Sequence, residues 1–140
     1  MTIDLCAAFQ SLMPGVLFAL FLVAACATVS EADSYRDAVS AVHRDEYDLA
    51  ARLFHPLAEQ GHAGAQSYLG VFYANGQGLP KDVMRAYMWL TVAIPGSRGD
   101  DVKTAIRNQR RVASDMTAEQ IAQAQDMARR CRDTQFAQCA

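Results

Sequence analysis

The side chains best suited to bind a metal ion or to transfer a proton are the three histidines, His43, His55 and His62. A zinc site on one helix needs two histidines about one turn apart, and other zinc sites combine histidines with closely spaced cysteines. The chain contains no His-x-x-x-His pair, no Cys-x-x-Cys pair and no mixed spacing of that kind. The sequence therefore predicts no metal site, and no motif in it points to a cofactor.

The candidate nucleophiles lack the partners that catalysis requires. Ser67 and Ser114 stand in no motif that supplies a base, and Gly76-x-Gly78 is too short to form a phosphate-binding loop. The adjacent carboxylates of Asp100 and Asp101 are explained by the start of a helix, where acidic side chains complement the helix dipole. The sequence therefore predicts a protein that is not an enzyme.

Two of the four cysteines, Cys131 and Cys139, lie close together near the end of the chain. Arg129, Arg130 and Arg132 would lower the pKa of a free Cys131 thiol and make it reactive. A disulfide between Cys131 and Cys139 is favoured over a reactive thiol, because we expect an exported protein and an oxidising compartment keeps such a bond intact.

The expectation of export comes from an uncharged segment between Leu5 and Ser30. Its apolar centre is followed by Ala25-Cys26-Ala27, which fits a signal-peptide cleavage site. The same region resembles a bacterial lipobox, in which Cys26 would be acylated. We therefore expect residues 1–27 to be a signal peptide or a lipoprotein signal. Residues 28–140 would then form a mature domain that is periplasmic, secreted or lipid-anchored in the bacterial envelope.

Two features of the N-terminus leave alternatives open. Residues 1–10 contain no Lys or Arg and carry Asp4, whereas a signal peptide usually begins with positive charge, so a wrongly assigned start codon is one alternative. The apolar stretch of about 18 residues is also just long enough to span a membrane as an uncleaved anchor. Pro14-Gly15 argues against that anchor, because it shortens the continuous apolar part.

Beyond Ser30 the apolar residues recur with helical periodicity, without strand-like alternation. Pro56 falls inside one expected helix, where it should remove a backbone hydrogen bond or kink the helix. Asp82 is a good N-cap, and Thr117 with Gln120 forms a capping box. We expect a first helix through Tyr35 and Val42, a second ending near Gly61, a third from Ala63 to Ala74, a fourth from Val83 to Ile94, a fifth beginning at Asp100 or Asp101, and a sixth that carries Ile121, Ala124, Ala128 and Cys131.

These helices pair into three hairpins, and part of the sequence repeats. The pattern Ala51-x-x-Phe54-x-x-x-Ala58-x-x-Gly61 returns 35 residues later as Ala86-x-x-Trp89-x-x-x-Ala93-x-x-Gly96. A repeat of this length is typical of stacked helical hairpins. Neither hairpin can bury its apolar face alone, so stacking must supply the core.

From Gly61 to Gly96 the sequence resembles the Sel-1-like repeat family, which is related to the tetratricopeptide repeats. The resemblance covers residues 35–131, and the segment 116–122 resembles the C-terminal cap that follows such repeats in exported bacterial proteins. It departs from the family pattern at Ile94-Pro95. The residues that match the pattern, and that we expect to be structural, are Ala65, Leu69, Gly70, Tyr73, Gly76, Gly78, Asp82, Ala86, Trp89, Ala93 and Gly96.

The resemblance implies an all-α fold, a short right-handed α-solenoid of about three helix hairpins that ends in a capping hairpin. It also implies protein–protein binding, so the expected partner is a protein or peptide. A net charge of −2 gives no reason to expect nucleic acid. In a solenoid the first helix of each hairpin lines a concave binding face. We expect Ser67, Val71 and Asn75 to lie there, although ordinary solvent exposure explains them equally well.

The expected function is therefore a binding or scaffolding module of the bacterial envelope. One alternative is an envelope hydrolase that acts on cell-wall-derived or β-lactam-like compounds. Another is a structural role in which the module self-associates. The segment Glu31 to Glu59 carries an excess of acidic residues and Arg98 to Arg132 an excess of basic ones. This asymmetry fits either solvated helix faces or association of an acidic end with a basic end.

Overall fold

The computed structural model describes residues 32–137 and 139. The chain divides into two units, Met1–Ser34 and Tyr35–Ala140, and the helices described below belong to the second. The expected signal segment 1–27, with the lipidation candidate Cys26, lies outside the described residues. Those residues form helices and turns without a strand, so the all-α prediction is confirmed. No helix in this part of the chain is both long and apolar enough to cross a membrane.

The helices lie close to the positions that periodicity predicts. Residues 35–43 are helical. The helices that follow are α3 (Tyr47–Glu59), α4 (Ala63–Asn75), α5 (Val83–Ala93), α6 (Asp100–Ala113) and α7 (Ala118–Asp133). Helix α5 ends one residue before the expected Ile94 and gives way to a 3₁₀ turn, η1 (Ile94–Gly96). Pro95 explains this ending, because it has no N–H to continue the α-helical hydrogen bonds.

Caps fix where three helices begin or end, and those at Asp82 and Thr117 are the ones that the sequence predicts. The Asp82 carboxylate accepts hydrogen bonds from the N–H groups of Met84 and Arg85, each 3.0 Å long, at the start of α5. Thr117 and Gln120 form the reciprocal capping box of α7. Gly76 ends α4 in the left-handed conformation, with φ at 70°. A glycine adopts this conformation without the steric cost that a side chain would add.

Helix α3 continues through Pro56 to Glu59 instead of ending at the proline. Pro56 is exposed and stands one turn before the end of the helix. The carbonyl group that loses its intrahelical N–H partner there is that of Arg52, and Arg52 is also exposed. Water can therefore replace the missing donor, which limits the cost of the proline.

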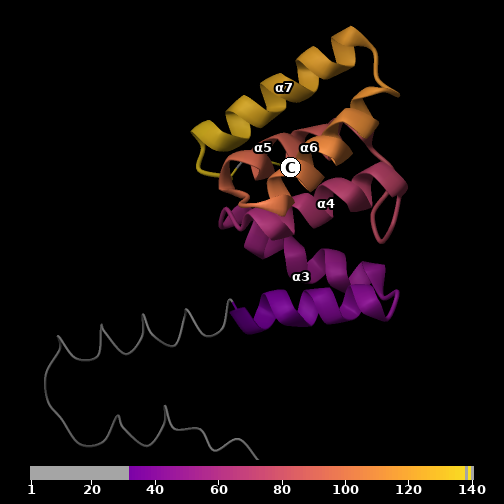
Figure 1. The fold of residues 1–140 in the computed structure, drawn as a ribbon, viewed down its shortest axis with the longest axis vertical. Coiled ribbons are helices and arrows are strands. Elements are labelled where there is room, and N and C mark those ends of the chain that lie inside the picture. Colours follow the sequence, from indigo (N-terminus) through magenta and orange to yellow (C-terminus); the bar gives the residue numbers. More distant parts are fainter. Residues whose placement is uncertain (1–31, 138, 140) are drawn as a thin grey trace, which may run out of the picture. The chain divides into compact units, whose positions relative to one another are not determined.

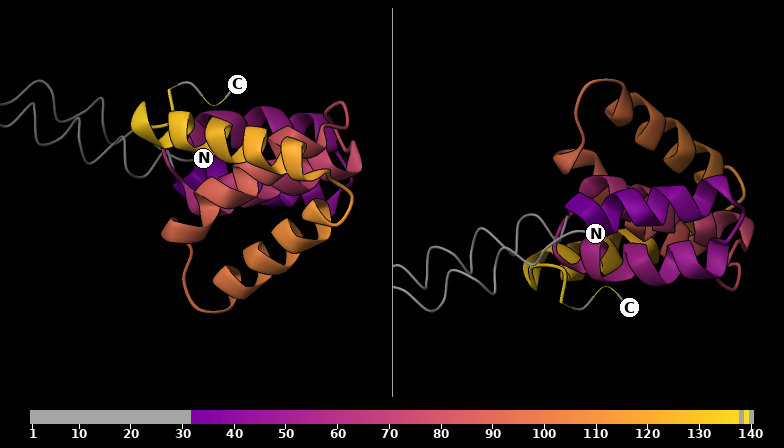
Figure 2. Two further views of the ribbon diagram at one scale, coloured as in Figure 1. Left: turned by 90° about the horizontal axis from the view of Figure 1, so that it is seen from above. Right: turned by 90° about the horizontal axis from the view of Figure 1, so that it is seen from below.

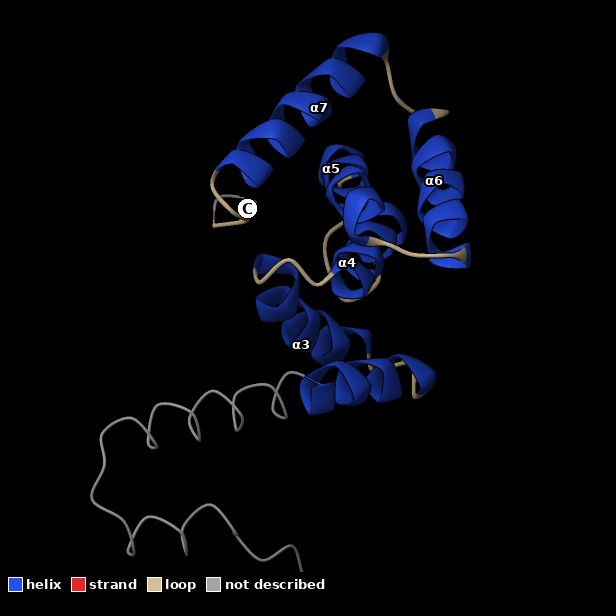
Figure 3. Cartoon of the chain, turned by 60° about the vertical axis from the view of Figure 1, so that its left-hand side comes forward, coloured by secondary structure: helices blue, strands red, loops and turns tan. Residues whose placement is uncertain are grey.

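Helices α3 to α6 pack on their neighbours in the chain, whereas α7 packs on α5 (Figures 1 and 3). Helix α3 lies against α4, and α4 lies against α5. Both α6 and α7 pack on α5, and they scarcely touch each other. Figure 2 shows α6 standing apart from the layer formed by the other helices. The last two helices are therefore not a closed hairpin of the kind that the sequence leads us to expect.

Large side chains fill the core between these helices. Trp89 on α5 is 1% exposed, and Phe54 on α3 and Leu69 on α4 are fully buried. The amide of buried Gln66 donates a hydrogen bond of 3.0 Å to the carbonyl oxygen of Ala58, which ties α4 to α3. The smaller repeat residues, among them Ala65, Ala86 and Ala93, are also buried, as their structural role requires.

The C-terminal end of α7 is joined to the tail by a disulfide between Cys131 and Cys139, the pair that the sequence favours. Their Cα atoms are 4.6 Å apart, and both residues are buried. The chain reverses through Gln135 and Phe136, both with positive φ. Phe136 packs back on Gly61, where an added Cβ would lie 2.9 Å from its ring. The tail therefore covers the α3–α4 turn.

Candidate binding cleft

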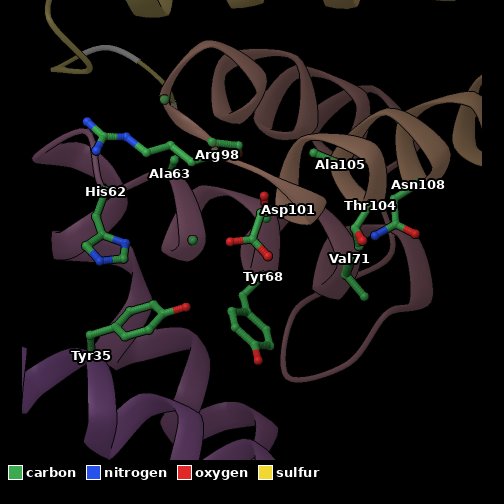
Figure 4. A pocket seen from close by; sticks show the side chains of 14 residues that line it. Tyr35, His62, Ala63, Tyr68, Val71, Arg98, Asp101, Thr104, Ala105 and Asn108 are labelled. Carbon is green, nitrogen blue, oxygen red and sulfur yellow. The ribbon is translucent and has the colours of Figure 1, made fainter.

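A cleft of about 710 Å³ lies between α4, the first described helix and α6 (Figure 4). Tyr35 stands on one side, α4 forms the floor, and α6 with the η1 turn forms the other side. The lining residues are Tyr35, His62, Ala63, Gly64, Ser67, Tyr68, Val71, Gly96, Ser97, Arg98, Asp101, Thr104, Ala105 and Asn108.

Aromatic rings dominate one side of the cleft. The Tyr35 ring stacks on His62 with ring centroids 4.3 Å apart. The Tyr68 ring stacks on buried Phe54 at 4.5 Å and is nearly parallel to it. Gly64 makes room for this arrangement, because a Cβ there would lie 2.6 Å from the Tyr35 hydroxyl oxygen. Both tyrosines are half-buried, so each presents part of its ring to the cleft.

The histidine and one of the serines in the cleft are engaged by the backbone. His62 Nδ1 accepts a hydrogen bond of 3.2 Å from the N–H of Ala65 and so caps α4. The Ser97 hydroxyl donates a hydrogen bond of 2.8 Å to the carbonyl oxygen of Ala93. His62 and Ser97 do not hydrogen-bond to each other, as a catalytic base and its nucleophile would.

Two charged side chains, Arg98 and Asp101, reach the cleft from the segment that begins α6. Figure 4 shows the Asp101 carboxylate and the Tyr35 hydroxyl directed into the hollow, whereas the Arg98 side chain extends the other way, over His62. The pKa of Tyr35 is raised above its ordinary value, first by burial and then by the nearby Tyr68 and Asp101. The negative field of Asp101 therefore reaches the Tyr35 hydroxyl.

Of the three surface residues expected from the sequence, the structure brings two into the cleft. Ser67 and Val71 line it, one turn apart on α4. Asn75 lies outside it, exposed at the end of α4, where its amide donates a hydrogen bond of 2.8 Å to the side chain of Gln77.

The aromatic and charged groups of the cleft were not predicted from the sequence. A signal for Tyr68 was present, because Gly64, Tyr68 and Val71 follow the helical spacing of one face. No such signal existed for Tyr35 or Asp101, which reach the cleft from other helices. Their contribution depends on how the helices pack.

A second, more open hollow of about 520 Å³ lies between α3 and the turn before α5. His55 stands in it, 3.9 Å from the Glu59 carboxylate and edge-on to the Trp89 ring. Gly78 forms part of its rim at a point where any Cβ would collide with the backbone of Tyr47. Within residues 32–137 and 139 no three His, Cys, Asp or Glu side chains are grouped so that they could hold a metal ion.

Comparisons with known proteins give this cleft no precedent. No protein-family model matches the chain. No curated protein and no solved structure matches it either. The interpretation of the cleft therefore depends on its own geometry and on the residues that line it.

Proposed function

We propose that this chain is a non-catalytic binding module of the bacterial cell envelope, and that its cleft holds a segment of a partner protein. The observation that carries the proposal is the composition of the cleft. Its walls combine aromatic rings with uncharged hydroxyl and amide groups, including those of Ser67, Thr104 and Asn108. Rings of this kind supply contact area at low entropic cost, and such polar groups can hydrogen-bond a peptide backbone.

The proposed architecture is a short Sel-1-like α-solenoid. It is supported by the order in which α3, α4 and α5 pack and by the repeat that places Phe54 and Trp89 in the core. The arrangement of α6 and α7 around α5 fits a terminal cap, because it covers the last repeat instead of extending the stack.

Export to the envelope is supported by two independent features. The first is the uncharged segment from Leu5 to Ser30. The second is the pairing of Cys131 with Cys139, a bond that reducing compartments do not maintain. The absence of catalysis is supported by His62 and Ser97, whose side chains are bound to backbone groups.

Selection from a phage-displayed library of random short peptides tests the binding function. The full chain in detergent is the bait, and we expect it to enrich peptides that compete with one another for one site. Val71→Asp places a charge on the cleft floor and should abolish the enrichment, whereas Gln123→Asp on the exposed surface of α7 should leave it unchanged. Peptides enriched equally by both variants, or no enriched peptides at all, would contradict the proposal.

A further inference from the structure

One end of the cleft holds polar groups that form no hydrogen bond or ion pair with another described side chain, and the Asp101 carboxylate among them is exposed to solvent. The Asp101 carboxylate forms no ion pair there, although the neighbouring Asp100 pairs with Lys103 at 2.9 Å. The hydroxyl groups of Tyr35 and Tyr68 form no hydrogen bond with any described residue. These three side chains come from three different helices, and they line one continuous hollow (Figure 4).

A carboxylate beside partly exposed aromatic rings is suited to bind a cation. The ring faces attract positive charge through their quadrupoles, and the exposed Asp101 carboxylate can add an ion pair, which is modest by itself but reinforces the attraction of the rings. The raised pKa of Tyr35 agrees with this, since Asp101 is one of its causes after burial and Tyr68. The field that opposes a negative charge on Tyr35 favours a positive charge nearby.

The nearest cation in the cleft does not fill this role. Arg98 is exposed, forms no ion pair with a described residue, and extends over His62 away from Asp101 (Figure 4). The cleft therefore has a positive end at Arg98 and a negative end at Asp101. A ligand without a positively charged group beside Asp101 forms no ion pair at the negative end and gains no binding energy there.

We propose that Asp101, Tyr35 and Tyr68 form a pocket for an arginine or lysine side chain of the bound peptide segment. This inference depends on the proposed binding function and adds the chemistry of the partner. Arginine fits better than lysine, because its planar guanidinium can stack on a tyrosine ring and direct two N–H groups at one carboxylate. The partner is therefore a protein that presents a basic residue in an accessible segment.

The same display selection, repeated with matched variants of the full chain, tests the pocket. The parent chain should enrich peptides with Arg or Lys at one fixed position. Asp101→Asn should still enrich peptides but without that preference. Asp100→Asn is the control, since it removes the same charge from the same helical turn outside the cleft, and its preference should match the parent.

The contribution of the charge is measured with the most enriched synthetic peptide and with a copy in which citrulline replaces its arginine. Citrulline keeps the shape and removes the charge. We expect citrulline to weaken binding to the parent by about tenfold, and to change binding to Asp101→Asn little. Unchanged thermal melting of both variants will show that the fold is intact.

Four outcomes would overturn the inference. The proposed pocket would be wrong if the enriched peptides show no preference for Arg or Lys, or if that preference changes equally in Asp101→Asn and Asp100→Asn. Either result would leave the proposed binding function intact. A dimer of the chain that Val71→Asp dissociates would make a second copy the occupant. A parent chain that enriches no peptide removes the proposed function, and the pocket with it.

Discussion

Gly70 on α4 lies directly against Leu90 on α5, so closely that a Cβ on Gly70 would stand 2.6 Å from Leu90 Cγ. The carbonyl oxygen of Ala86 would be 3.2 Å from the same Cβ. Leu90 is fully buried, so any shift of its side chain must be taken up by its packed neighbours. The separation of α4 and α5 is therefore set by the missing side chain at position 70.

Gly70→Ala should destabilise the protein even though alanine favours helices. Overpacking of a closed core costs about 1–3 kcal/mol, which exceeds the gain of about 1 kcal/mol in helix propensity. For a unit of this size we expect the melting temperature to fall by several degrees, measured by circular dichroism. Ser67→Ala on the same helix is the control and should change stability little. An equal or higher melting temperature for Gly70→Ala would show that α4 and α5 are further apart than described.

Trp89→Ala should cost about 3–5 kcal/mol, because it removes a large buried side chain of α5 whose ring contacts His55 on α3. A domain of this kind has only about 5–15 kcal/mol of stability, so the variant should melt far below the parent or remain unfolded. Trp89→Phe keeps most of the side-chain volume, so its melting temperature should lie between those of the parent and Trp89→Ala. Melting of Trp89→Ala at the temperature of the parent would contradict the burial of this side chain and the repeat alignment that predicts it.

The Cys131–Cys139 disulfide should stabilise the end of α7. Closing so short a loop restricts the unfolded chain by about 2–3 kcal/mol in the chain-entropy model. Reductant should therefore lower the melting temperature of the parent but not the melting temperature of Cys139→Ser. Thiol counting on the denatured, non-reduced protein provides a direct check. Free thiols at both positions would refute the bond and weaken the case for export.

The Tyr35 hydroxyl should titrate above its ordinary pKa, mainly because of burial. Tyrosine is neutral below its pKa, so the folded state retains this proton longer than the unfolded state as pH rises. The stabilising contribution is complete below pH 10 and is lost as pH rises through the folded pKa. In ultraviolet difference titration, Tyr35→Phe should remove a late component. Asp101→Asn should lower the pKa of that component only in part, since Asp101 is a smaller cause than burial.

If the late component has the same pKa in the parent and in Asp101→Asn, the Asp101 carboxylate does not influence the titration of Tyr35. That result would also weaken the proposed pocket. Tyr47 is a necessary internal comparison, because its pKa is raised as well, first by its hydrogen bond to Asp45. Tyr47→Phe identifies its contribution to the titration curve.

Processing of the N-terminus is tested by the intact mass of the protein recovered from a bacterial host. Cleavage near residues 25–27 should remove the apolar segment. A lipid adduct on Cys26 would select the lipoprotein alternative, and Cys26→Ala should then release the protein from membranes. A mass that still contains residues 1–25 would exclude cleavage and favour an uncleaved anchor.

The helices and their caps follow from local chemistry, so the sequence predicts them well. Asp82 and Thr117 act on N–H groups two or three residues away, and Pro95 ends α5 by its own lack of a donor. The open arrangement of α6 and α7 was not predictable in this way. An amphipathic pattern indicates which side of a helix is apolar, but not which of two neighbours that side will contact.

The cleft was predictable in part for the same reason. Ser67 and Val71 lie on one helix, and their shared face can be counted from the spacing. The electrostatic interaction between the Asp101 carboxylate and the Tyr35 hydroxyl involves residues that are far apart in the chain. Such a relationship exists only after α6 has packed beside α4, and no short-range pattern encodes it.

The position of α6 determines how wide the cleft can be. Only two residues of this helix, Ala105 and Val112, are buried, and the helix begins after Gly99, whose φ is 57°. An element with so few buried side chains is displaced at lower free-energy cost than α5, which is buried along most of its length. We therefore expect the width of the cleft to change more readily than the packing around α5. For the proposed peptide ligand, a shift of α6 would change the width of the cleft without moving the tyrosine side, so we expect selectivity to depend on charge more than on size.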